Sequence, residues 1–310
     1  MRPRPRMASV NGGYEYAARV AAEAEGERVL DWLARRYAHS SADTWQARVE
    51  AGEVDLDGAT ARAGDRLRAG QRVVWRRPPW EEPAVPLGFA LLHRDEHVLA
   101  VAKPRGLPSV PAGGFLEHTL LLRVRRLFPG VTPLHRLGRG TSGVLLFARS
   151  ERARRAIGAE WRAGGVEKDY LALVAGTPPR AVFSIDVPIG PVPHPRLGLV
   201  HAAASDGRPA LSQVRVVAAR GAATLVAVRI PTGRPHQIRI HLAAAGHPLV
   251  GDPLYVAGGV PGEAPGLPGD GGYWLHAHRL RFTHPSTHER LTLECGPPPL
   301  LRTGVDEPAI

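Results

Sequence analysis

The residues most suited to chemistry are histidines, and their spacing argues against a catalytic metal. The chain contains 14 of them, and neutral imidazole is a common metal ligand. His236 and His241 share a predicted helix but lie five residues apart, and no segment reads HExxH, which sets two zinc ligands on one helix face. His276 and His278 would project from one face of a strand. The sequence therefore predicts no metal site.

A glycine-rich segment, GRGTSG at residues 138–143, suggests two further kinds of site. Ser142 stands in TSG rather than in GxSxG, the turn that exposes a nucleophilic serine in α/β-hydrolases. The segment also lacks the Lys-Ser/Thr ending of a phosphate-binding loop. Neither a nucleophilic serine nor a nucleotide-phosphate loop is expected here.

One arginine and one tyrosine are better candidates for a pocket. Arg239 follows His236 by three residues on a predicted helix, so the two side chains share a face. The surrounding HQIRIH favours a pocket role over an ordinary solvated arginine. Tyr170 belongs to an alternating strand, 170–174, and is expected to be a half-buried aromatic.

Composition narrows the partners and the compartment. The formal net charge of +11 and the pI of about 10.8 favour polyanions, nucleic acid first, although a GC-rich genome also raises arginine content. Cys295 is the single cysteine, so no internal disulfide can form and a cytoplasmic location is expected. No apolar stretch approaches the roughly 20 residues that span a bilayer, and no apolar segment follows the basic start to make a signal peptide.

The elements that would position these residues fall into two predicted domains. Residues 1–13 are expected to be a disordered start, and residues 14–78 read as a small α+β module. Its first helix follows the apolar spacing of Val29 to Tyr37, and Ser41 can cap a second. Asp57-Gly58 signals a tight turn between strands. A proline-rich linker at 79–88 then separates this module from residues 89–310.

The larger domain mixes helices and strands without a regular strand-helix-strand rhythm. Hairpin signals flank Arg94-Asp95-Glu96, Ser150 can cap a helix, and Pro235 is suited to a first helical turn. Ala257 to Gly272 is rich in Gly and Pro and should be a surface loop. The pattern predicts an α+β fold with a mainly antiparallel, mixed sheet and flanking helices.

Several segments of this larger domain occur in a recognisable order. They are DEHVLAVAKPRGLP at 95–108, HRLGRGTSG at 135–143, EKDYLALVAG at 167–176, GRPHQIRIHLAAAGHPLVGDPLY at 233–255 and LHAHRLRFTHP at 275–285. In these segments the chain resembles the RluA-type RNA pseudouridine synthases, over a span from Phe89 to Pro299. The small module is similar to an RNA-binding fold named after a ribosomal small-subunit protein, through ARVEAGEVDLDG and AGDRLRAGQRVVW.

The resemblance implies a pseudouridine synthase catalytic fold, an RNA substrate and a reaction without a cofactor. In the family an aspartate acts at the sugar C1′ or on its neighbouring proton, an arginine pairs with that carboxylate, and a tyrosine lies against the base. Arg239 matches the pairing arginine, Tyr170 matches the tyrosine, and Arg136 matches the residue associated with the space left by the flipped base. Catalytic roles are accordingly expected for these three.

The chain departs from the family pattern at the aspartate itself, where Gly138 stands. A glycine can be neither nucleophile nor general base, and no Asp or Glu occurs between Glu117 and Glu151. Arg239 would then lack its usual partner, so we expect it to face water or an RNA phosphate, because a buried unpaired arginine is costly. Two outcomes stay open: isomerisation through another carboxylate, such as Asp252 or Asp169, or an inactive RNA-binding protein that keeps the cleft.

The expected partner is ribosomal or transfer RNA, bound by a monomer without metal. Phosphate contacts from basic side chains would supply much of the affinity. The residues expected to contact RNA around the cleft are Lys103, His135, Arg136, Arg139, Arg234, His236 and Gln237.

Overall fold

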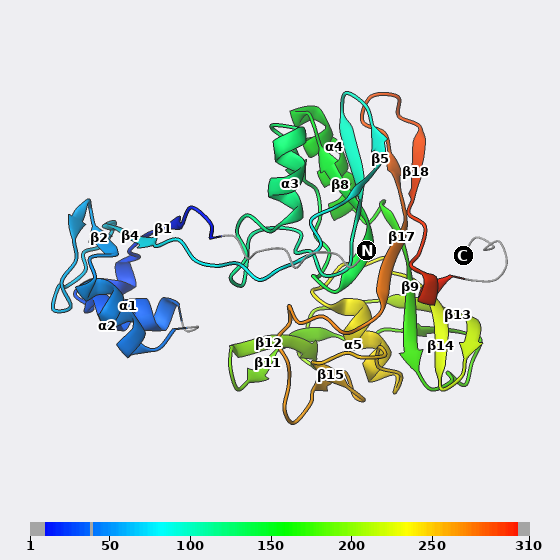
Figure 1. Cartoon of the computed structure of the whole chain (residues 1–310). Coiled ribbons are helices and arrows are strands. Elements are labelled where there is room, and N and C mark those ends of the chain that lie inside the picture. Colours follow the sequence, from blue (N-terminus) through cyan, green and yellow to red (C-terminus); the bar gives the residue numbers. More distant parts are fainter. Residues whose placement is uncertain (1–9, 38–39, 303–310) are drawn as a thin grey trace, which may run out of the picture. The chain divides into compact units, whose positions relative to one another are not determined.

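Residues 10–37 and 40–302, described by a computed structural model, divide into two units (Figure 1). The first comprises the described residues through Glu82 together with His194–Gly198, and the second comprises Pro83–Pro193 and Leu199 onward. The expectation of a disordered start falls mainly on residues 1–9, which lie outside the described residues. Residues 10–13 make specific contacts, since Asn11 donates a side-chain hydrogen bond to Glu82.

The first unit is a four-stranded antiparallel sheet with two helices. Ser41 accepts a hydrogen bond from the Thr44 amide and begins the second helix, as predicted. Asp57 and Gly58 both have positive φ, 50° and 91°, which matches the tight turn expected of this pair. The sheet order is β1-β4-β2-β3, and the elements are β1 (Tyr14–Arg19), the 3-10 turn η1 (Ala22–Ala24), α1 (Val29–Arg36), α2 (Ala42–Glu50), β2 (Val54–Leu56), β3 (Ala59–Thr60) and β4 (Arg72–Arg77).

The second unit is built on a ten-stranded sheet. Its central path runs β10-β13-β14-β9-β17-β8-β6-β5, with β18 on β17 and β7 on β8. Of its pairs, β17 with β8 is parallel and the others are antiparallel, so the predicted α+β fold with a mainly antiparallel, mixed sheet is confirmed. The strands are β5 (Ala90–Arg94), β6 (Val98–Lys103), β7 (Thr132–Pro133), β8 (Thr141–Ala148), β9 (Glu167–Ala175), β10 (Val182–Ile185), β13 (Ser212–Arg220), β14 (Ala223–Arg229), β17 (Leu275–Thr283) and β18 (Arg290–Glu294).

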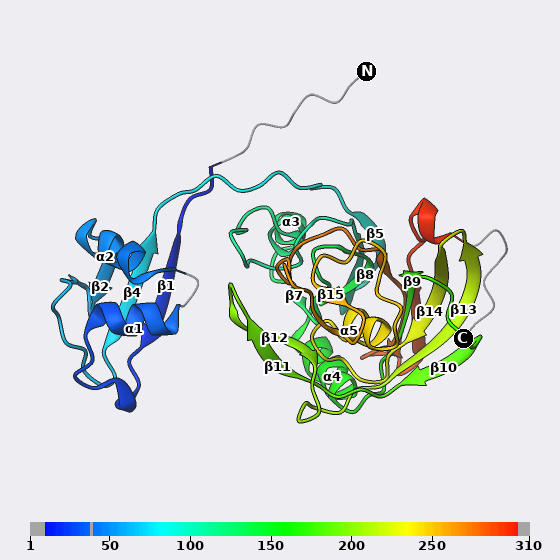
Figure 2. The same ribbon diagram turned by 90° about the horizontal axis from the view of Figure 1, so that it is seen from below.

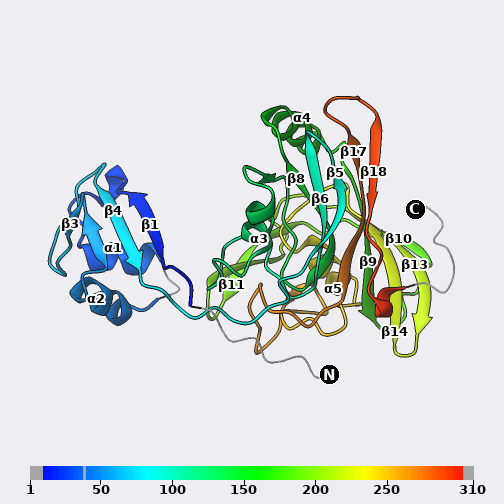
Figure 3. The ribbon, with the colours of Figure 1, turned by 45° about the horizontal axis from the view of Figure 1, so that its top comes forward.

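Helices cover both faces of β6 and β8, which explains why β8 is buried along its whole length. One face, with Val144 and Leu146, packs on α4 (Glu151–Arg162) through Ile157. The other face, with Leu145, packs on α3 (Leu120–Leu127). Alternate residues of a strand point to opposite faces, so a strand between two layers must be apolar throughout. Figure 3 shows both helices beside these strands.

The other half of the sheet, β9, β14, β13 and β10, curves around α5 (Gln237–Ala244) (Figure 2). Ile238 and Leu242 of α5 join the core formed by Val226 and Val228. The helix begins two residues later than Pro235 predicted, because His236 takes a left-handed conformation, φ 55°, as its N-cap. The remaining elements are β11 (Ile189–His194), β12 (Gly198–Ala203), β15 (Tyr255–Val256), β16 (Val260–Pro261) and the 3-10 turn η2 (Pro299–Leu301).

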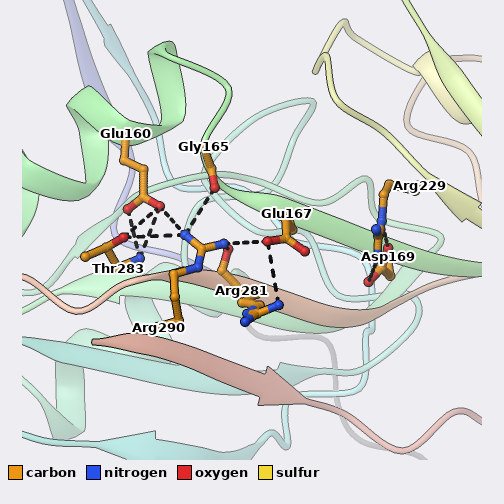
Figure 4. A network of polar contacts seen from close by, with 8 residues as sticks. All are labelled: Glu160, Gly165, Glu167, Asp169, Arg229, Arg281, Thr283 and Arg290. Atoms are coloured by element: carbon orange, nitrogen blue, oxygen red, sulfur yellow. Dashed lines mark hydrogen bonds and ion pairs between the residues drawn. The ribbon is translucent and has the colours of Figure 1, made fainter. Parts of the chain in front are cut away.

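A polar network links α4 to the edge of the sheet (Figure 4). Arg290 on β18 donates to Glu160 at 2.6 Å and to Glu167 on β9 at 2.7 Å. Glu160 also accepts the Thr283 amide at 2.9 Å, so one carboxylate connects the helix with the end of β17. Such a network fixes the register of β9, the strand that carries Tyr170.

Candidate active site

The loop that contains Gly138, residues 134–140, lies between β7 and β8 and is anchored by hydrogen bonds to the segment around Gly106 and Ser109. Ser109 donates to the Leu137 carbonyl at 2.7 Å and accepts from the Leu137 amide at 3.1 Å. The Gly106 amide donates to the Arg139 carbonyl at 2.8 Å. Leu137 is therefore anchored in the core, while Arg136 and Gly138 on either side are exposed. The loop presents these two positions outward from a fixed base.

Lys103 is part of this base, which corrects the expectation that it contacts RNA. Its side chain is 1% exposed, and Nζ donates to the carbonyls of Pro104, Leu107 and Arg139 at 3.0, 2.6 and 3.3 Å. Burial lowers the pKa of its amine to about 7. The amine is enclosed by carbonyl oxygens and joins two loops instead of meeting a phosphate.

The space above Gly138 where a side chain would begin is occupied. A Cβ added to Gly138 would lie 2.7 Å from Tyr273 Oη, a distance that real Cβ contacts essentially never show. The Tyr273 hydroxyl lies 3.3 Å from Thr141 Oγ1, and its residue is 1% exposed. The glycine and the tyrosine are thus sterically matched. Sequence reasoning missed Tyr273, because it follows a Gly/Pro-rich loop and belongs to none of the motifs that carried chemistry.

Arg239 is buried and paired, so the expectation that it faces water or RNA is wrong. Its Nε and Nη2 donate to the two oxygens of Asp252, both at 2.7 Å, and the side chains are 2% and 1% exposed. Nη1 donates to the Pro268 carbonyl at 3.0 Å. The guanidinium lies over the rings of Tyr273 and Tyr255, 4.3 and 4.9 Å from their centroids. Although burial disfavours its charge, hydrogen bonding to Asp252 raises the pKa of Arg239.

Neither carboxylate considered as a substitute for the missing aspartate is free. Asp252 also accepts the amides of Leu254 and Tyr255 at 2.9 and 3.1 Å, so both of its oxygens are used. Asp169 is 4% exposed and accepts two hydrogen bonds from Arg229, at 2.7 and 3.1 Å. Each carboxylate would have to break a charged pair before reaching a ribose.

Tyr170 lies between the two halves of the second unit's core. On β9 it is paired with Ala277 of β17 and Val228 of β14. It packs against the cluster that contains Leu137 and against the cluster that contains Tyr273. The side chain is half-buried, and burial, with the charge of Asp169, raises the pKa of its hydroxyl to about 12. Tyr170 is thus a neutral phenol at physiological pH.

His236 faces the same group of residues from the start of α5. Its Nδ1 donates to Tyr255 Oη at 2.8 Å, since that hydroxyl donates onward to the His201 carbonyl at 2.7 Å. Burial, followed by the charge of Arg239, lowers the pKa of His236 to about 3. The imidazole is therefore neutral at physiological pH.

Two other residues expected to contact RNA are structural. Gln237 is 2% exposed; it donates to the Leu211 carbonyl at 2.7 Å and accepts from the Arg234 amide at 3.0 Å. His135 accepts the Leu146 amide at 3.0 Å and stacks on Trp161 at 4.8 Å. Burial, with a smaller effect of Lys168, lowers the pKa of His135 to about 3. Both side chains are fully engaged in holding the fold.

The remaining arginines are partly or fully exposed. Arg136 is exposed on the loop, and Arg139 and Arg234 are partly exposed while anchored by carbonyls, Gly269 at 2.7 Å and Pro209 at 3.0 Å. A cavity of about 200 Å³ adjoins Arg234, and His201 and Arg208 also line it. The sequence contained no motif around these last two residues that would have singled them out.

The described residues contain neither a candidate metal-binding cluster nor a helix that could span a membrane. Among residues 10–37 and 40–302, no group of three or more His, Cys, Asp or Glu is arranged to hold a metal ion. No helix in the described part of the chain is long and apolar enough to cross a bilayer.

Comparison with known proteins connects this geometry to one group. Residues 97–244 match the family model described as RNA pseudouridylate synthase. A Synechocystis protein named an uncharacterized RNA pseudouridine synthase is 44% identical over 278 residues, 89% of this chain and 96% of that protein. The Arabidopsis thaliana protein named RNA pseudouridine synthase 5 is 34% identical over 351 residues, 95% of each chain. The solved human RNA Pseudouridylate Synthase Domain Containing 1 is similar with a TM-score of 0.54 and 26% identity, over 71% of this chain and 89% of that one.

Proposed function

We propose that this protein, which belongs to the RNA pseudouridine synthase family, isomerises uridine to pseudouridine in structured RNA, ribosomal or transfer. The observation that carries the proposal is the convergence of three elements. Leu137 of the anchored loop and Tyr170 on β9 share one packed cluster, Tyr170 also packs on the cluster that contains Tyr273, and Arg239 on α5 lies over the Tyr273 ring. The reaction breaks and re-forms bonds within one nucleotide, so it requires no redox partner or group donor.

Charge supports RNA as the substrate. Residues 1–82 contain 14 arginines against 13 acidic residues, so nearly all of the net +11 belongs to residues 83–310. Exposed Arg136 and partly exposed Arg139 and Arg234 are the side chains we assign to phosphates. A uridine must leave its stack to reach a pocket, at a cost of a few kcal/mol that phosphate contacts must offset.

Within the site we assign Tyr170 to the flipped base and Arg239 to the electrostatics beneath it. A half-buried aromatic can stack on a base, and a neutral hydroxyl can hydrogen-bond to it. Arg239 contributes a fixed cation whose charge Asp252 largely compensates. Both oxygens of Asp252 accept hydrogen bonds, so carboxylate chemistry at Asp252 would first require its pair with Arg239 to open.

A second function, RNA binding without isomerisation, is favoured by one specific observation. The loop carries no side chain at Gly138, and the hydroxyl of Tyr273 fills that space. Loss of a catalytic nucleophile typically costs many orders of magnitude in rate. A protein of this kind would bind the same RNA, with the same salt dependence, and form no product.

Pseudouridine mapping of ribosomal and transfer RNA from cells with and without the gene distinguishes the two functions. We expect a pseudouridine that disappears with the gene and returns with the wild-type chain, but not with Tyr170→Phe. If the two maps are identical while the purified chain still binds the RNA, isomerisation is refuted and the binding function remains. The Trp161→Phe variant is a control, because this aromatic packs on His135 and on the cluster of Val144 and Ile157, which does not include Tyr170.

A further inference from the structure

One atom, Tyr273 Oη, occupies the place where a side chain of residue 138 would begin. Apart from the neighbouring residues, two described atoms lie within 4 Å of a Cβ added there: Tyr273 Oη at 2.7 Å and Thr141 Oγ1 at 3.5 Å. The second distance is ordinary van der Waals contact. Removing only the hydroxyl oxygen of Tyr273 would therefore open the space in which a side chain of residue 138 begins.

Gly140 meets a different part of the same ring. A Cβ added to Gly140 would lie 2.8 Å from both Cε1 and Cζ of Tyr273. These are ring atoms that phenylalanine also has. A side chain at position 138 would clash with the Tyr273 hydroxyl oxygen, whereas a side chain at position 140 would clash with carbon atoms of the Tyr273 ring.

The ring cannot move away easily. Tyr273 is 1% exposed, and its carbonyl accepts from Arg105 Nε at 3.1 Å. Its chain neighbour Gly272 approaches Gly251 so closely that a Cβ added to Gly251 would lie 2.6 Å from the Gly272 carbonyl oxygen. The ring also meets the Arg239 guanidinium, which lies 4.3 Å from its centroid. Backbone contacts and a buried ion pair therefore determine the position of the hydroxyl.

We propose that Tyr273 is a positioning residue whose hydroxyl replaces the loop carboxylate, so that this hydroxyl and a side chain at position 138 exclude each other. The catalytic part of this inference rests on the proposed function. The steric part, that the hydroxyl and a side chain at position 138 exclude each other, does not depend on it. A carboxylate introduced at position 138 by a single substitution would displace Tyr273 and disturb Arg239. The same carboxylate would fit beside phenylalanine at position 273.

Thermal unfolding of five variants, three single and two double, tests the steric part without any activity. Overpacking makes Gly138→Ala lower the melting temperature, by roughly 3–10 °C, and Tyr273→Phe should remove most of that loss in the double variant. Gly140→Ala is the matched control, because Tyr273→Phe leaves both clashing ring atoms in place. The entropy effect of Gly→Ala on the unfolded chain cancels when the two backgrounds are compared. Equal losses from Gly138→Ala in both backgrounds would overturn the inference.

Pseudouridine formation tests the positioning part. We expect Gly138→Asp combined with Tyr273→Phe to form product at least about tenfold faster than Gly138→Asp alone, because the Tyr273 hydroxyl no longer obstructs the introduced carboxylate. A tenfold difference in rate corresponds to about 1.4 kcal/mol in the activation barrier. A carboxylate titrates near pH 4, so the double variant should also gain a rate dependence at acidic pH that Tyr273→Phe lacks. If Gly138→Asp alone is as stable and as active as the double variant, the inference fails. If no variant and no wild-type chain forms product, the proposed function fails, and the unfolding cycle still decides the steric claim.

Discussion

Asp252→Asn is the most informative test of the site, because it removes the partner of a buried charge without changing side-chain size. Arg239 and Asp252 are 2% and 1% exposed and share two hydrogen bonds of 2.7 Å. Oδ1 of Asp252 accepts from Arg239 Nη2 and from the Leu254 and Tyr255 amides, whereas Oδ2 accepts from Arg239 Nε. An amide at position 252 has one oxygen and can replace only one of these two acceptors. In either orientation an NH₂ group faces another donor.

The expected loss follows from burial. Breaking a buried ion pair by removing one partner costs about 3–5 kcal/mol, because the remaining charge stays desolvated. With a urea m-value of about 3 kcal/mol per molar, at the upper end for small proteins, the midpoint of unfolding should fall by about 1–1.7 M. Hydrogen exchange of the α5 amides assigns this loss to the second unit, since Arg239 lies on that helix.

Two comparisons make the test sharp. Glu151→Gln breaks the exposed pair with Arg154 and should leave the urea midpoint unchanged. Arg239→Met combined with Asp252→Leu removes both charges and should recover most of the stability lost in Asp252→Asn. If Asp252→Asn has the wild-type midpoint and the wild-type exchange of α5, the pair is not a buried charge contact in solution and the site described above is wrong.

Three further predictions concern the phenol, the buried amine and the exposed arginines. Tyr170→Phe should lower pseudouridine formation at least about 100-fold without weakening RNA binding, and equal rates in a single-turnover assay would exclude a role for the hydroxyl. Burial holds the folded pKa of Lys103 near 7, below its unfolded value, so the folded chain releases this proton first and stability should rise from about pH 7 to pH 10, by at most about 1.4 kcal/mol per pH unit. Lys103→Met should flatten that rise in melting temperatures measured across this range, and an unaltered pH profile would contradict the assignment. Joint replacement of Arg136, Arg139 and Arg234 by Ala should reduce the salt slope of RNA binding by about 0.7–0.9 for each phosphate that the variant no longer neutralises, whereas an unchanged slope in filter binding would place the RNA elsewhere.

Local features of the fold could be predicted from sequence, because they depend on neighbouring residues. The Ser41 cap, the Asp57-Gly58 turn and the apolar run of β8 each follow from backbone preferences or from periodicity. The strand β1 was missed, because the alternation of Tyr14, Tyr16 and Ala18 is short and its side chains are exposed or only partly buried. Pairing with β4, a long-range event, is what makes it a strand.

The site was predicted less well, for a physical reason. The motifs identified Arg239 and Tyr170, but side-chain partners depend on which segments the fold brings together. Asp252 was considered only as a substitute catalyst, whereas it is the ion-pair partner of Arg239. Lys103 had the charge of an RNA-binding residue, and only the surrounding carbonyls show that it is enclosed. Residue type predicts chemistry, while burial decides whether that chemistry can reach a ligand.

The pairing of Arg239 with Asp252 also explains how the chain tolerates Gly138. Where a loop carboxylate is the only partner of a buried arginine, its loss leaves an uncompensated charge and destabilises the fold. Here Asp252 already compensates Arg239, and the Tyr273 ring covers the guanidinium. Arg239 therefore has its counter-charge without a carboxylate at position 138. Restoring a carboxylate there is then limited by the space that Tyr273 Oη occupies and not by the electrostatics of Arg239.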